Sequence, residues 1–146
     1  MNVSRRKGRE FAMQLLYAVE VGKEAYASAL EGLAADPAVG ADAKEYGVFL
    51  SGKVLEKQEE IDGRIREVSS NWDLERLAVV DRIVIRCAAA ELMYCGDVPA
   101  KVAINEAIDI AKKFSTGDSS RFVNGVLDAI AKQYLNTNQK DPQDAH

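Results

Sequence analysis

The chain of 146 residues carries 19 Lys and Arg against 23 Asp and Glu, which gives a formal net charge of −4. This length supports one core of ordinary size and leaves no room for a second catalytic domain. Hydrophobic residues make up 47% of the sequence. No uninterrupted apolar run reaches the ~20 residues of a membrane span, and the basic N-terminus lacks the apolar core of a signal peptide. We therefore expect a cytoplasmic protein without membrane association.

Helical periodicity runs through the whole chain. Apolar residues recur with the spacing of one helix face, and no Gly-rich turn separates alternating apolar segments, so a β-hairpin is not indicated. The predicted helices cover, in order, residues 4–21, 23–35, 43–70 with a kink near Gly63, 74–95, 99–114 and 119–135. Residues 1–135 are expected to form one all-α domain, followed by a disordered polar tail from 136 to 146.

The predicted helix over residues 74–95 is apolar around most of its circumference, which is typical of a central helix. Glu91 falls inside one apolar arc, so we expect a partner for its carboxylate. Cys87 and Cys95 are about 12 Å apart along the helix axis, which is too far for a disulfide. Both are expected to be buried thiols, because His146, the one histidine, is terminal and cannot complete a metal or Cys–His site.

No catalytic constellation is visible elsewhere in the sequence. There is no Gly-rich phosphate loop, no cluster of metal-ligand residues and no Ser–His pair. The 23 carboxylates fall mostly on helix faces that water solvates in any case. We therefore expect a protein that is not an enzyme and that needs no cofactor or metal.

Basic residues concentrate at the start of the first helix, in the cluster Arg5, Arg6, Lys7 and Arg9. The negative net charge argues against indiscriminate nucleic-acid binding, whereas one local basic patch fits a defined docking site. A solvated helix end explains the charges equally well by itself. Cations at a helix N-terminus oppose the helix dipole at a cost of roughly a few tenths of a kcal/mol, which favours phosphate contacts.

Tyr17 lies almost opposite the centre of the apolar face of the first helix, beside Glu10, Met13 and Val21. An outward aromatic next to outward apolar residues is typical of a protein contact. The alternative is a tyrosine that lies flat on the surface of its own protein. A partner-binding face on this helix is therefore one of two interpretations.

A short turn separates the last two predicted helices and carries residues that packing alone does not explain. Asp118 either caps the following helix or accepts hydrogen bonds from base edges, and Lys113 and Arg121 supply nearby charge. Phe122 sits at the margin of the apolar face, one turn before Gly125. Because an exposed glycine inside a helix costs roughly 1 kcal/mol relative to alanine, we expect a ligand to approach the backbone there.

Three segments resemble the NusB family of bacterial transcription antitermination factors. The C-terminal part of that family is similar to DVPAKVAINEAIDIAKKF followed by SSRFVNGVLD, and its first helix is similar to SRRKGREFAMQLLYAVE. With NWDLERLAVVDRIVIRCAAAEL, the likeness extends over nearly the whole chain, and it departs between Gly22 and Asp42 and after Leu135. The resemblance implies a compact, two-lobed all-α bundle of six to seven helices.

The same resemblance implies a non-enzymatic factor that binds the single-stranded boxA element of nascent ribosomal RNA. It would do so together with NusE, a small-subunit ribosomal protein, and then join NusA, NusG and RNA polymerase. NusE would dock on the face around Tyr17, with Asp81 at the family's acidic position and Glu75 and Arg76 beside it. A monomer and a homodimer both stay open. The alternatives are a helical adaptor that binds protein but no RNA, and an RNA-modification accessory domain acting in trans.

Overall fold

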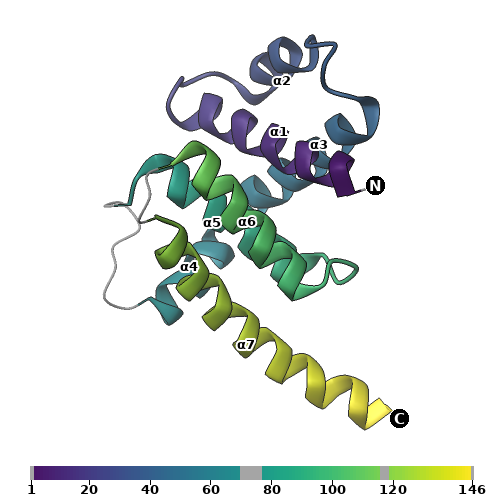
Figure 1. Cartoon of the computed structure of the whole chain (residues 1–146), viewed down its shortest axis with the longest axis vertical. Helices are drawn as coiled ribbons and strands as arrows, with labels where there is room; N and C mark the ends of the chain where they lie inside the picture. The colour runs from purple at the N-terminus through teal and green to yellow at the C-terminus, as the bar shows by residue number, and fades with distance from the viewer. Residues whose placement is uncertain (1, 70–76, 116–118, 146) are drawn as a thin grey trace.

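The chain folds as an all-α bundle (Figure 1). The structure, a computed structural model, describes residues 2–69, 77–115 and 119–145, with side chains described within 4–69, 77–115 and 119–133. Over these ranges it contains no strand and the following helices: α1 (Asn2–Glu20), α2 (Tyr26–Ala34), α3 (Ala41–Glu56), α4 (Gln58–Val68), α5 (Val79–Tyr94), α6 (Ala100–Phe114) and α7 (Ser119–Ala145). The predicted class and helix number are confirmed. No helix in the described part is long and apolar enough to cross a membrane.

Two clusters of buried residues divide the bundle into two lobes, and α1 contributes to both. In the smaller lobe, Phe11 and Leu15 of α1 pack with Ala29 of α2. In the larger lobe, the face of α1 that carries Ala12 and Leu16 packs with residues of α3 to α7. Figure 1 shows α2 beside α1 at one end of the molecule and α7 running away from the bundle at the other. The helix pair α1 and α3 makes the most extensive contact.

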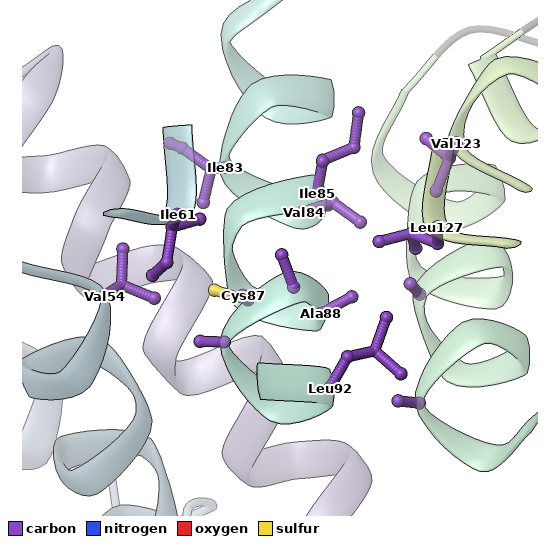
Figure 2. Packing of buried hydrophobic residues seen from close by; sticks show 14 of the residues in the cluster. Val54, Ile61, Ile83, Val84, Ile85, Cys87, Ala88, Leu92, Val123 and Leu127 are labelled. Carbon is purple, nitrogen blue, oxygen red and sulfur yellow. The ribbon is translucent and has the colours of Figure 1, made fainter. Parts of the chain in front are cut away.

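α5 is the central helix of the larger lobe, as its apolar circumference predicts. Figure 2 shows Ile83 on the side of Val54 and Ile61, which belong to α3 and α4, and Val84 on the side of Leu127 of α7. All five residues are at least 97% buried. Because a fully buried aliphatic side chain contributes about 1.5–3 kcal/mol, the contacts of α5 are a main source of stability in this lobe.

The third predicted helix is two helices in the structure. The predicted kink near Gly63 is wrong, because the chain leaves the helical conformation at Lys57, with φ of −110° and ψ of 20°. Gly63 continues α4 without a break. A glycine tolerates a kink but does not require one, so its presence alone was insufficient evidence for the break.

Two further boundaries differ from the predicted ones. α5 begins at Val79 instead of Leu74, because Ala78 has an extended ψ of 142°. The predicted cap Asp73 lies outside the described residues. At the C-terminus, α7 continues to Ala145, where the sequence analysis expected a disordered tail from residue 136.

Two glycines let α1 and α3 approach each other closely. A Cβ atom added at Gly47 would lie 2.6 Å from Cδ2 of Phe11 and 3.0 Å from the carbonyl oxygen of Gly8. A Cβ atom added at Gly8 would lie 3.0 Å from Cβ of Tyr46. The two helices are therefore held together next to Tyr46, which lies at the basic end of α1.

Candidate nucleic-acid interface

Arg9 lies inside the protein. Its side chain is 7% exposed, and its Nε donates to both carboxylate oxygens of Glu91, at 2.9 and 3.0 Å. Glu91 also accepts a hydrogen bond from the hydroxyl of Tyr46. Burial opposes the charge of Arg9, but the hydrogen bond and the charge of Glu91 raise its pKa. The prediction that Glu91 has a partner is confirmed, whereas the prediction that Arg9 belongs to an exposed patch is wrong.

Arg6 links α1 to α6. Its guanidinium donates to Glu106 at 2.5 and 2.7 Å and to Asp109 at 2.9 Å. The hydrogen bond with Glu106 raises the pKa of Arg6, and the same bond lowers the pKa of Glu106. The Arg6 side chain is 34% exposed, so it offers a phosphate one open side while two carboxylates hold the other.

Arg5 and Lys7 are more accessible than the other cations at this end of α1. The guanidinium carbon of Arg5 lies 4.3 Å from the centre of the Tyr46 ring, a cation–π geometry. The ion pair of Arg5 with Asp97 is long, at 3.4 Å, and the Arg5 side chain is 41% exposed. Lys7 is exposed. We refer to Arg5, Arg6 and Lys7 as the basic cluster.

A groove of about 1150 Å³ opens beside the basic cluster. Arg5 forms part of its lining, together with Tyr46 and Phe49 of α3 and Val102 of α6. The sequence analysis did not single out these aromatic residues for a site, because the helical pattern counts both as core residues. Phe49 is 46% exposed, which only the tertiary structure reveals.

Lys113 lies at the end of α6, where α6 leads to α7. Arg5 pairs with Asp97, which precedes α6, whereas Lys113 in the last turn of α6 pairs with Glu10 of α1 at 3.2 Å. Arg6 of the basic cluster pairs with Asp109, which precedes Lys113 by one turn on the same face of α6. Lys113 is therefore adjacent to the basic cluster, and with the start of α7 it forms a second group of predicted RNA-binding residues.

The start of α7 continues the second group. Arg121 and Gly125 are exposed, and no atom lies within 4 Å of the position that a Cβ of Gly125 would take. Phe122 is half-buried and packs against the larger cluster. Asp118 lies outside the described residues, so its two predicted roles stay predictions.

The predicted partner face on α1 is smaller than the helical wheel suggested. Tyr17 and Val21 are each 44% exposed. Met13 is 7% exposed and lies among residues of α5 and α6, such as Val84 and Ile110. The prediction that Met13 faces outward is wrong, because α5 and α6 cover that side of α1.

Asp81 is also buried, at 7% exposure. Its Oδ2 accepts a hydrogen bond of 2.8 Å from the hydroxyl of Ser119, which joins the first turn of α5 to the first turn of α7. Oδ1 has no hydrogen-bond partner in the described part of the chain. Because its side chain is buried, Asp81 is not positioned for a direct contact with a partner protein. Glu75 and Arg76, its predicted neighbours, lie outside the described residues.

Both cysteines are free and buried. Burial raises the pKa of Cys95 to about 11, and it raises the pKa of Cys87 further. Within the described residues, no group of three or more His, Cys, Asp or Glu side chains is arranged to hold a metal ion.

Comparison with known sequences identifies the relatives of this chain. The profile of the NusB family matches residues 6–132. The transcription antitermination protein NusB of Chloroherpeton thalassium is 47% identical over 131 residues, which are 88% of this chain and 62% of that protein. The chain thus spans less than two thirds of the length of this relative.

Two solved structures share the fold. T. maritima NusB has a TM-score of 0.80 and 39% identity, over 88% of this chain and 90% of that one. A chain in the crystal structure of antitermination factors NusB and NusE in complex with dsRNA has a TM-score of 0.82 and 28% identity, over 92% of this chain and 100% of that one. The match to the family profile, together with the close relatives, shows that the chain belongs to the NusB family.

Proposed function

We propose that this protein is a non-enzymatic, RNA-binding transcription antitermination factor. It binds the single-stranded boxA element of nascent ribosomal RNA together with NusE, and the pair joins NusA, NusG and RNA polymerase in the cytoplasm. The relative from Chloroherpeton thalassium is named as a transcription antitermination protein, and one structural neighbour was solved with NusE and dsRNA. Both proteins are named as antitermination factors and not as enzymes, which supports the non-enzymatic role.

The observation that carries RNA binding is the accessible basic cluster at the start of α1. Arg5 rests on the ring of Tyr46, and this contact reduces the side-chain entropy that is lost when the guanidinium binds a phosphate. Lys7 adds a second accessible charge. Arg9 supports the cluster from inside, because its ion pair with Glu91 anchors α1 to α5.

The second group of predicted RNA residues would read bases. Phe122 offers an aromatic edge, Gly125 leaves open backbone beside it, and Lys113 and Arg121 supply charge. Asp118 would accept hydrogen bonds from a base edge. One RNA could touch both groups, because Arg6 pairs with Asp109, one turn from Lys113 on α6.

NusE would dock on the exposed pair Tyr17 and Val21, next to Glu10. Glu75 and Arg76 would extend this surface. Asp81 would act indirectly, by holding the first turns of α5 and α7 together through Ser119.

The test is a titration of labelled boxA RNA with the protein alone and then with NusE. Arg5→Ala/Lys7→Ala should weaken RNA binding, and Lys132→Ala/Arg66→Ala, which removes two exposed cations from α7 and α4, should not. Tyr17→Ala should weaken the binding of NusE and leave RNA binding by the free protein unchanged, whereas Leu55→Ala, which truncates a similarly exposed residue of α3, should alter neither.

The competing function is a helical adaptor that binds protein without RNA contact. It is favoured by the ion pairs of Arg6 and Arg9 with carboxylates of the same chain, because these pairs make both cations less available to phosphates. It predicts NusE binding with no measurable affinity for boxA RNA. Sedimentation at the concentrations of the titration distinguishes a monomer from a homodimer, since a homodimer that covers the basic cluster would bind RNA only after it dissociates.

A further inference from the structure

The groove beside Arg5 has the composition of a pocket for one unpaired base. α3 contributes the aromatic rings of Tyr46 and Phe49, whose centroids are 6.0 Å apart with a tilt of 38°. Val102 of α6 adds a second exposed apolar side chain, at 43% exposure. A base needs an aromatic or apolar face on which to stack, and Phe49 offers such a face at 46% exposure.

The carboxylates of the groove differ in their availability. Asp97 is paired with Arg5, and Glu106 is paired with Arg6 and Arg9. Asp42 and Glu45 are exposed and have no ion pair with a described residue. Open acceptors therefore occur on the α3 side of the groove.

The open acceptors lie on the same helix face as the aromatic platform. Glu45 precedes Phe49 by four residues and Asp42 precedes it by seven, so all three side chains share one face of α3. A carboxylate repels phosphate but accepts hydrogen bonds from base N–H groups. Guanine fits best, because its N1–H and its N2 amino group are adjacent donors that one carboxylate accepts together.

Arg5 connects this groove to the phosphate-binding surface. It lines the groove and belongs to the basic cluster, so a nucleotide whose phosphate lies on Arg5 can turn its base toward Phe49. A basic protein segment would also suit the open carboxylates. The exposed aromatic ring next to a half-exposed arginine favours a nucleotide, because both halves of a nucleotide then have a partner.

We propose that the groove between α3 and α6 is a base-binding subsite, in which an unpaired guanine stacks on Phe49 and donates to Glu45, with Asp42 as a second acceptor. This inference rests on the proposed RNA-binding function and adds a specificity determinant to it.

The experiment measures fluorescence anisotropy of labelled oligouridines of about ten nucleotides that carry one central guanosine, inosine or uridine. Phe49→Ala should weaken binding of the guanosine probe by about 5- to 150-fold with an unchanged salt slope, since the same phosphates stay bound. Phe49→Trp should retain the affinity. Glu45→Gln should remove the preference for guanosine over inosine, which lacks the N2 amino group. Val48→Ala is the matched control, because Val48 is a 37% exposed neighbour on α3 that does not line the groove.

The outcomes separate the two proposals. If the wild-type protein binds none of the probes, the proposed RNA-binding function fails, and the subsite fails with it. If the wild-type protein binds RNA and the folded Phe49→Ala and Glu45→Gln variants bind each probe with the affinity of the wild type, the subsite alone is overturned. A loss of NusE binding without a loss of RNA binding in Phe49→Ala would also overturn it, because the groove would then be a protein-docking site.

Discussion

Arg9→Met tests whether the cations at the start of α1 have two different roles, with Arg9 stabilising the fold and Arg5 and Lys7 binding RNA. The guanidinium of Arg9 donates to Glu91 at 2.9 and 3.0 Å and to Glu106 at 3.4 Å. Its removal leaves Glu91, which is 1% exposed, with the Tyr46 hydroxyl as its remaining hydrogen-bond donor among the described residues. Breaking a buried ion pair in this way costs about 3–5 kcal/mol, so the free energy of unfolding should fall by about this amount.

Urea unfolding followed by circular dichroism measures the loss. The double variant Arg9→Met/Glu91→Met should recover most of it, because no uncompensated charge stays buried. Salt titrations of RNA binding supply the second measurement. Arg9→Met should leave the salt slope unchanged wherever the variant is folded, whereas Arg5→Ala/Lys7→Ala should reduce the slope by about 1.4, or about 0.7 for each phosphate that the variant no longer neutralises.

Two results would refute this reasoning. A stable Arg9→Met variant whose salt slope falls by about 0.7 would place Arg9 on a phosphate. A double variant as unstable as Arg9→Met would show that the loss comes from packing of the arginine stem and not from the stranded charge of Glu91.

Three further predictions concern packing, acid stability and thiol reactivity. Gly47→Ala should lower the free energy of unfolding by about 1–3 kcal/mol in urea titrations, because its Cβ would overlap Phe11; Gly52→Ala, which has open space around it, should instead raise it by up to about 1 kcal/mol. The pKa of Glu106 is lowered in the folded state, so its contribution is complete above the ordinary value of about 4.5 and is lost as the pH falls through the folded pKa. Glu106→Gln should therefore lose less stability than the wild type in unfolding curves below about pH 4.5, and an equal loss would contradict the role of Arg6. Cys87 and Cys95 should react with Ellman's reagent at mildly alkaline pH only after denaturation, and rapid reaction of the native protein would disprove their burial.

The sequence predicted the helices and the central position of α5 well, because these features follow from local apolar periodicity. Periodicity reports which residues share a face, and burial of the apolar face then determines the packing. The break at Lys57 could not be predicted in this way. Lys57 has no intrinsic tendency to end a helix, and the helices on either side of it, α3 and α4, both contact α5.

The candidate site was predicted less well, because its important contacts join residues far apart in the chain. Arg6 and Glu106 are 100 positions apart, and Arg9 and Glu91 are 82 apart. A helical wheel places a cation on a face but does not show which helix covers that face. Met13 illustrates the same limit, since its wheel position beside Tyr17 is covered by α5 and α6.

The position of the cations at the start of α1, which opposes the helix dipole, has a structural explanation besides RNA. Carboxylates of α5, of α6 and of the segment between them face these cations, and the pairs Arg5–Asp97, Arg6–Glu106 and Arg9–Glu91 offset the cost of the dipole. Their charges largely cancel, so this surface attracts phosphates less strongly than the cluster suggests in the sequence. Specific RNA binding by a protein of net charge −4 must therefore depend on stacking, on base-edge hydrogen bonds and on the second partner. Such contacts distinguish one RNA sequence from another, whereas a purely cationic surface would bind every RNA alike.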